Sequence, residues 1–165
     1  MSDTLEVWMR GPVEGVPALL QPVAHALLQA VEDAEDKLIH IAPADLWQRP
    51  NGVASVGFHL LHMRGVVDRM FTYSLEKPLS ETQFAALKAE TEVHDHLTAS
   101  DLVTGFKQQV TEAITQLKQT KETGLTATRY LGRKRIPVTL IGLLFHAAEH
   151  IQRHTGQALV TARML

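Results

Sequence analysis

Residues 143–160 read LLFHAAEHIQRHTGQALV, a stretch that combines a helical apolar pattern with evenly spaced histidines. His146, His150 and His154 follow one another at intervals of four residues. Four residues advance an α-helix by about 40° beyond one full turn, so the three imidazoles form a narrow stripe on one face. The side chains beside this stripe are Leu143, Ala147 and Thr161. They predict that the stripe faces the interior of a helix bundle or a cleft in it.

Apolar residues recur at helical spacing in three other long stretches as well. They predict helices over residues 13–41, 53–75 and 98–121, in addition to the last helix, which runs from Pro137 to about residue 164. Four long helices without a convincing strand pair predict an all-α four-helix bundle with a short extra helix and long loops. The length of 165 residues indicates a single domain, 1–165, with residues 1–13 as an N-terminal arm.

Capping and breaking residues set the predicted helix ends. Pro17 and Pro22 fall early in the first stretch, so that helix begins after Pro22 or is kinked in its first turns. Ser80 with Gln83 three residues later predicts a capping box for the short extra helix, which ends near Glu90. Pro137 is placed in the first turn of the last helix. The remaining segments are predicted to be loops, the last of them irregular: 42–52, 90–96 and 125–136.

Composition excludes several classes of function. The formal net charge of −2 and the absence of a Lys/Arg stripe argue against a nucleic-acid partner, and the basic cluster of residues 129–135 is local. The chain has no cysteine, which rules out disulfides and thiolate metal ligands. The sequence shows no signal-peptide pattern and no apolar run of about 20 residues, so we expect a cytoplasmic protein that binds no membrane.

The nine histidines are the unusual feature of the composition. Two imidazoles four residues apart on one helix can chelate one metal ion, and a third must come from another helix. The predicted second helix offers His59 and His62 in the stretch SVGFHLLHMRG. Three protein ligands would leave positions open for water or substrate, which is typical of catalytic sites. Alternatively, the clustered histidines are ordinary hydrogen-bonded residues of the core. The other four histidines have no partner at ligand spacing and are interpreted as surface or loop residues: His25, His40, His94 and His96.

The chain resembles the DinB/YfiT-like superfamily of metal-dependent four-helix-bundle proteins across about residues 14–163. The matching stretches are WQRPNGVASVGFHLLHM at 47–63, GRKRIPVTLIGLLFHAAEH at 132–150 and HIQRHTGQALV at 150–160. The resemblance implies that the three metal ligands are His62, His150 and His154, the last two preceding Gly156-Gln157. It also implies a homodimer and one divalent transition metal, zinc, nickel or iron.

Several side chains near the histidine stripe have two possible roles each. His59 and His146 are alternative ligands, or groups that orient a ligand or line the cavity. Arg153 is at the cavity edge, where it holds a carboxylate of a thiol cosubstrate, or it pairs with Glu149 in solvent. Gln157 orients a ligand imidazole or makes a helix–helix contact. The loop and surface predictions are that Trp47 pins its loop onto the core and that Asp68 and Arg69 form a surface pair.

The resemblance implies an enzyme as the first functional hypothesis. Characterised relatives use a low-molecular-weight thiol such as bacillithiol, mycothiol or glutathione, and a chain without cysteine is compatible with a thiol that arrives as a cosubstrate. The metal would activate that thiol, or a water, for transfer to a small electrophile. The alternative is a non-enzymatic bundle that binds a metal or a small ligand, of the stress-response type.

Overall fold

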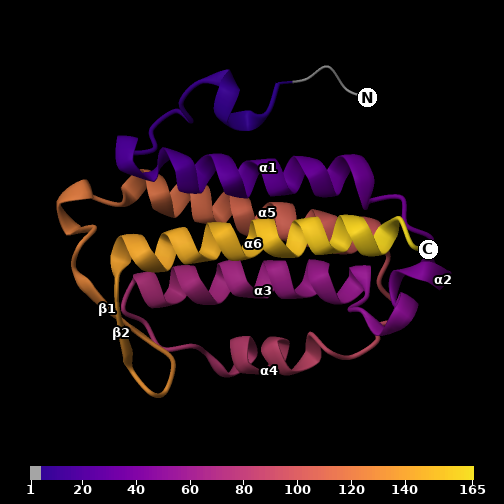
Figure 1. Ribbon diagram of the computed structural model, residues 1–165. Coiled ribbons are helices and arrows are strands. Elements are labelled where there is room, and N and C mark those ends of the chain that lie inside the picture. Colours follow the sequence, from indigo (N-terminus) through magenta and orange to yellow (C-terminus); the bar gives the residue numbers. More distant parts are fainter. Residues whose placement is uncertain (1–4) are drawn as a thin grey trace.

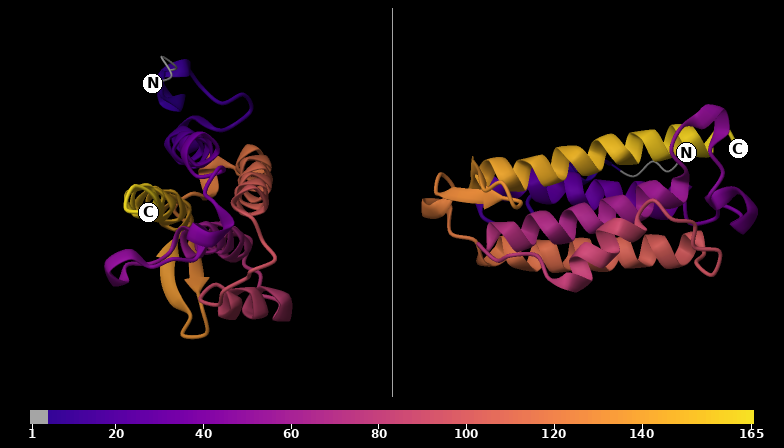
Figure 2. Two further views of the ribbon diagram at one scale, coloured as in Figure 1. Left: turned by 90° about the vertical axis from the view of Figure 1, so that its right-hand side faces the viewer. Right: turned by 90° about the horizontal axis from the view of Figure 1, so that it is seen from below.

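The computed structural model describes residues 5–165, so residues 1–4 of the predicted arm lie outside the described residues. Four long helices form the bundle predicted from the sequence (Figure 1). They are α1 (Gln21–Lys37), α3 (Val56–Ser74), α5 (Ala99–Gln119) and α6 (Leu140–Ala162). Helices α1 and α3 each pack against both α5 and α6, and the end-on view shows the four arranged around one core (Figure 2).

The core consists of the apolar faces of these helices. Burying a Leu, Met or Phe side chain contributes about 1.5–3 kcal/mol, which makes this core the main source of stability. Fully buried side chains come from all four helices and from the segments that lead into α1 and α3. The largest are Phe106, Leu20, Leu27, Leu38, Leu46, Leu60, Met63, Leu117, Leu144 and Ile151.

Side-chain caps fix where the helices begin. The hydroxyl of Ser55 accepts a hydrogen bond from the backbone N–H of Phe58 at the start of α3. The capping box predicted at Ser80 and Gln83 is present and opens the short helix α4 (Glu81–Ala89). Thr98 caps α5 in the same way, with Asp101 as its reciprocal partner. These caps satisfy backbone donors that have no partner inside the helix.

The first helix differs from its prediction at both ends. It begins at Gln21, one residue before Pro22, and follows a 3₁₀ turn over Ala18–Leu20. Pro22 causes no kink because its missing N–H falls in the first turn, where no helical partner exists. The helix ends at Lys37 instead of residue 41. Leu38 is still fully buried beyond that end, which explains the longer apolar pattern.

Residues 125–136 are not the irregular loop that was predicted, because they contain most of a β-hairpin. Strand β1 (Thr128–Leu131) pairs antiparallel with β2 (Ile136–Thr139), in a register that places Tyr130 opposite Pro137. The prediction that Pro137 lies in the first turn of the last helix was therefore wrong. Helix α6 begins three residues later at Leu140, with Thr139 as its cap. A two-stranded pair this short leaves little apolar alternation for a pattern search to detect.

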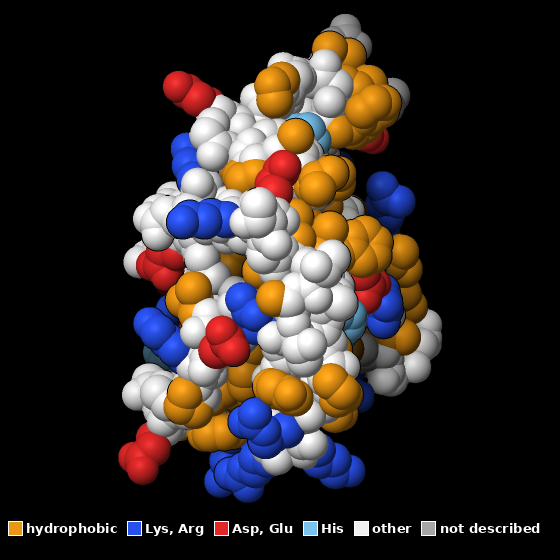
Figure 3. All heavy atoms as spheres, turned by 90° about the vertical axis from the view of Figure 1, so that its left-hand side faces the viewer, with side chains coloured by type: hydrophobic (Ala, Val, Ile, Leu, Met, Phe, Trp, Pro, Cys, Tyr) orange, Lys and Arg blue, Asp and Glu red, His pale blue; other side chains and the backbone are white. Residues whose placement is uncertain are grey.

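The hairpin turn depends on two residues with positive φ, Gly132 (63°) and Arg135 (49°). Arg129 anchors the hairpin by donating from Nε to the carbonyl oxygen of Ser74 at the end of α3 (2.7 Å). Lys and Arg side chains gather at the lower end of the molecule in Figure 3, where the hairpin lies in Figure 1. This small basic tip is the local cluster expected from the sequence.

The remaining elements are short. A 3₁₀ turn at Val7–Arg10 lies in the arm, α2 (Pro43–Leu46) and a 3₁₀ turn at Pro50–Gly52 lie between α1 and α3, and a 3₁₀ turn at Glu122–Gly124 follows α5. Trp47 packs directly over Gly57 of α3 and against the core, as predicted. In the described part of the chain, none of the helices has the length and apolarity needed to cross a membrane.

Candidate metal centre

Three histidines converge between helices α3 and α6, which run side by side (Figures 1 and 2). His62 projects from α3, while His150 and His154 project from successive turns of α6. One ring nitrogen of each lies within 4.8 Å of the others, so the three could hold one metal ion. The structure thus brings together the three side chains that the resemblance assigns as ligands. All three are partly buried and none is fully enclosed.

The spacing of the nitrogens suits a single ion. Nε2 of His62 and Nε2 of His150 are 3.0 Å apart. Two imidazole nitrogens on one tetrahedral zinc ion lie roughly 3.3–3.4 Å apart, given Zn–N bonds of about 2.0–2.1 Å. The rings of His62 and His154 have centroids 4.5 Å apart, and those of His150 and His154 are 4.6 Å apart. The donor set is all nitrogen, which suits zinc, nickel, iron or copper.

Burial favours the neutral form of two of the three converging imidazoles, and metal binding requires a neutral ring nitrogen. The pKa of His154 is lowered to about 4, first by burial and then by the positive charge that His62 can carry. The pKa of His150 is also lowered, for the same reasons in the same order. Both rings are therefore neutral near pH 7. Nδ1 of His150 is buried and has no hydrogen-bond partner among residues 5–165.

His59 lies behind His154 and contacts it directly. The two Nδ1 atoms are 2.9 Å apart, and His59 is only 4% exposed. The pKa of His59 is lowered to about 4 by its burial, with a smaller contribution from His62. Of the interpretations left open for His59, the geometry matches a group that orients a ligand. When Nδ1–H of His154 donates to Nδ1 of His59, Nε2 of His154 carries the lone pair that can bind a metal.

Glu90 is the site residue that the sequence analysis missed. Its Oε2 lies 2.7 Å from Nδ1 of His62, and its Oε1 accepts from Nη1 of Arg69. The predicted surface pair of Asp68 and Arg69 was wrong, since Arg69 is 6% exposed and bonded to Glu90. Asp68 instead accepts a hydrogen bond from Gln83 of α4. A charged residue at an inward-facing helix position was the available signal, because a buried arginine needs a buried acid.

His146 forms the outer end of the histidine stripe. It is exposed, and its Nδ1 lies 2.8 Å from Oε1 of Glu149, whose Oε2 accepts from Arg153 (2.6 Å). His146, Glu149 and His150 also bring ligand atoms within 4.8 Å of one another, so an alternative set sharing His150 exists on the more exposed side. Arg153 thus makes the pairing that was one of its two interpretations.

The other predicted side chains lie outside the cluster. Gln157 is exposed, and within residues 5–165 its side chain makes no hydrogen bond, so it orients no imidazole in this structure. His94 packs near Trp47 with ring centroids 5.6 Å apart, and His25 contacts the carbonyl oxygen of Gly11. Both, with the exposed His40 and His96, are the surface or loop residues predicted.

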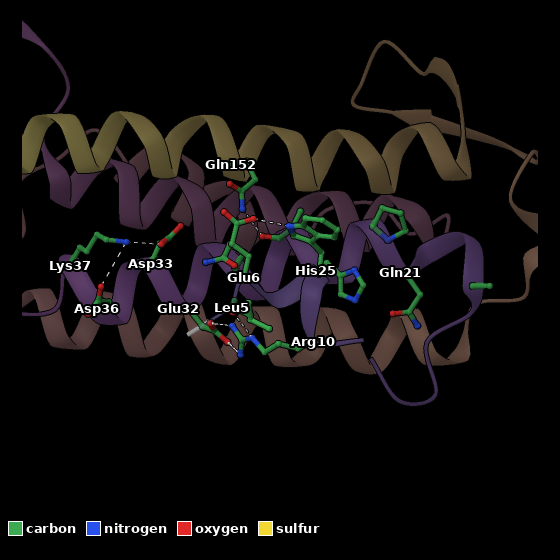
Figure 4. Close-up of a pocket in the computed structure, with 15 residues that line it drawn as sticks. Leu5, Glu6, Arg10, Gln21, His25, Glu32, Asp33, Asp36, Lys37 and Gln152 are labelled. Atoms are coloured by element: carbon green, nitrogen blue, oxygen red, sulfur yellow. Dashed lines mark hydrogen bonds and ion pairs between the residues drawn. The ribbon is translucent and has the colours of Figure 1, made fainter. Parts of the chain in front are cut away.

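A small cavity adjoins the site. Phe58 stacks on His62 with ring centroids 5.3 Å apart and planes 10° apart. Phe58 and Glu90 also line a cavity of about 210 Å³, together with Trp47 and Arg49. The larger hollow of the molecule, about 1220 Å³, is an open groove between the N-terminal arm and α1 (Figure 4). Gln152 reaches that groove from the face of α6 opposite the histidines, so the groove is not part of the cluster.

A family model described as the DinB superfamily matches residues 19–158, which includes all four bundle helices nearly to their ends. The chain belongs to the DinB superfamily. This confirms the resemblance found in the sequence. For this DinB protein, the match covers all three converging histidines as well as Glu90 and His59.

Solved structures support the same fold for the DinB protein. A conserved protein from Enterococcus faecalis is 23% identical, with a TM-score of 0.67 over 88% of this chain and 95% of that one. A DinB-like protein from Bacillus cereus is 19% identical, with a TM-score of 0.62 over 83% of this chain and 89% of that one. At these identities the likeness shows the bundle architecture alone. No match was found among curated proteins.

Proposed function

We propose that this DinB protein is a divalent-metal-dependent enzyme that transfers a low-molecular-weight thiol, or an activated water, to a small electrophile. The observation that carries the proposal is the convergence of three imidazoles, those of His62, His150 and His154, at one partly exposed point between α3 and α6. Three protein ligands leave at least one coordination position for an exchangeable group, as in catalytic rather than structural zinc sites.

The residues around the cluster support binding and orientation. A divalent cation held there would supply Lewis acidity, which lowers the pKa of a thiol or water at neutral pH. Arg49 and Phe58 line the adjacent cavity, whose volume of about 210 Å³ suits a small molecule. The Arg49 guanidinium matches the carboxylate that low-molecular-weight thiols carry. Because the chain has no cysteine, the thiol must come from a cosubstrate.

A second candidate is a non-enzymatic protein that binds a metal or a small ligand. The observation that favours it is the state of the two carboxylates nearest the histidines. Glu90 is bonded to Arg69 and Glu149 to Arg153, so neither is free to act as a general base. Homodimer formation and a cytoplasmic location stay predictions.

The test combines metal content with a transfer assay. Protein purified without a histidine tag or chelator should contain about one equivalent of zinc, nickel or iron, and His150→Ala should contain none. The metal-loaded protein is then assayed with glutathione, mycothiol or bacillithiol and a chromogenic aryl halide. Metal-dependent conjugation that is absent in His150→Ala supports the enzyme. Saturable metal binding without transfer for any of the thiols, or for water, would favour the second candidate.

A titration provides the limiting case. If the wild-type protein shows no saturable binding of zinc, nickel or iron, the histidine cluster is core architecture, and the enzyme and the metal-binding form of the second candidate both fail.

A further inference from the structure

Glu90 stands out because it contacts a candidate ligand from outside the two helices that carry the cluster. We propose that Glu90, held by Arg69, is a positioning residue that fixes the tautomer and ring orientation of His62. This inference rests on the proposed metal site, and it adds the residues that prepare one of the ligands. Glu90 acts on the site through its contact with His62, and Arg69 acts through Glu90.

The first step is the proton on His62. A carboxylate that already accepts from arginine acts as a hydrogen-bond acceptor, so the 2.7 Å contact is satisfied when Nδ1 of His62 carries the hydrogen. A neutral imidazole with a proton on Nδ1 has its lone pair on Nε2. Nε2 is the atom that faces His150 at 3.0 Å, in the middle of the cluster. Glu90 therefore selects the tautomer in which His62 presents a lone pair to a metal ion.

The second step is the charge on Glu90. This side chain is 5% exposed, and burying a carboxylate is costly unless a compensating charge and hydrogen bonds accompany it. Arg69 supplies that charge from two turns further along α3, and it is 6% exposed itself. Since arginine keeps its proton throughout the physiological range, the carboxylate of Glu90 has a permanent partner. The chain Arg69–Glu90–His62 is thus satisfied at both carboxylate oxygens.

The third step is the space that admits this pair. Glu90 and Arg69 meet over Gly65, on the surface of α3 between His62 and Arg69. A Cβ atom at position 65 would overlap Oε1 of Glu90 and would lie 2.5 Å from Nη1 of Arg69. Glycine in a helix interior costs about 0.5–1 kcal/mol relative to alanine. Its place here is explained by the close approach of the carboxylate to the helix backbone.

The experiment measures zinc affinity by competition with a chromophoric chelator. Glu90→Gln should weaken zinc binding about 10–100-fold, the usual effect of removing such a partner. This variant leaves Arg69 without its acid, so a second variant removes both charges: Arg69→Met combined with Glu90→Leu. The double variant avoids an uncompensated buried charge and should show the same loss while keeping its helical circular dichroism. Gly65→Ala should also weaken binding.

A matched control separates this effect from a general change in charge. Glu149→Gln removes a carboxylate that contacts His146, which lies outside the proposed ligand set, so its zinc affinity should stay within about twofold of wild type. NMR of the imidazole nitrogens supplies a readout independent of affinity. In zinc-loaded wild type the proton of His62 should reside on Nδ1, and this preference should weaken in Glu90→Gln.

The outcomes are distinct. Wild-type affinity in Glu90→Gln and in the double variant would overturn the positioning role while leaving the metal site intact. A loss in Glu149→Gln alone would also overturn it, since the ligands would then be His146, Glu149 and His150. Absence of saturable binding of zinc, nickel and iron by the wild-type protein would overturn the proposed function and this inference together.

Discussion

Oε2 of Glu90 lies 2.7 Å from Nδ1 of His62, although 28 residues separate the two in the chain. Helix α4 and the turn after it bring this carboxylate back onto α3, beside the histidine cluster. The site therefore takes groups from α3, α6 and the segment that follows α4. A change in any of these three segments is expected to affect metal binding.

Substitution can distinguish which pair of α6 histidines binds the metal, His150 with His154 or His146 with His150. His154→Ala should abolish stoichiometric zinc binding because it removes one of the three converging nitrogens. His146→Ala should retain about one equivalent, because His146 is exposed and bonded to Glu149. Elemental analysis of both variants after gel filtration measures the difference. The reverse pattern, with zinc lost in His146→Ala and kept in His154→Ala, would identify the more exposed set as the site.

Removing the metal should leave the bundle folded. The core beneath the cluster is apolar and complete without an ion, as fully buried Leu60, Met63 and Ile151 show. Chelated protein should therefore keep its helical circular dichroism and a cooperative melt. Adding zinc should raise the melting temperature, by a stabilisation of about 2.7 kcal/mol at 100 times the dissociation constant. His150→Ala should show no such rise, and a chelated protein that unfolds would indicate a structural ion.

The contact of Trp47 with α3 should be sensitive to one methyl group. A Cβ at position 57 would lie 2.7–2.9 Å from atoms of the Trp47 ring, so Gly57→Ala forces the ring or the helix to move. Such overpacking costs about 1–3 kcal/mol in free energy of unfolding. Urea unfolding followed by tryptophan fluorescence measures it.

Gly156→Ala provides the matched control for that substitution. Gly156 is also helical, and a Cβ there meets nothing within 4 Å. Alanine should therefore stabilise α6 by about 0.5–1 kcal/mol. If both variants had the same stability, the close approach of Trp47 to Gly57 would not matter energetically.

The stability of the metal-free protein should fall in mild acid. The pKa values of His59 and His154 are lowered from 6.5 to about 4 by burial, so the unfolded chain binds protons that the folded chain cannot. The free energy of unfolding therefore decreases as the pH falls from 6.5 towards 4, and this contribution is fully restored above 6.5. Urea unfolding of the chelated protein at pH 7.5 and 5.5 measures how much the free energy of unfolding falls with pH. His59→Leu should make this fall smaller. An equal fall in the variant would contradict the lowered pKa of His59.

Local chemistry alone determined much of this protein. The apolar period of 3.6 residues identified the four long helices, and the Ser80–Gln83 box located the start of α4. Both signals work because helical geometry and capping depend on residues at most a few positions apart. The same helical geometry places His146, His150 and His154 on one face of α6, whatever they contact. The family assignment also followed from short stretches of sequence.

Long-range packing decided the rest. No local pattern shows that Glu90 returns to His62 and Arg69, because that contact depends on the path of the chain through α4. Likewise, the hairpin at 128–139 forms by cross-strand pairing and by anchoring Arg129 on Ser74, neither of which leaves a clear period in the sequence. Residues a few positions apart are enough to predict the helices and the histidine stripe. Which side chains meet His62, His150 and His154 depends on the tertiary fold, because burial and ion pairing arise between segments distant in the chain.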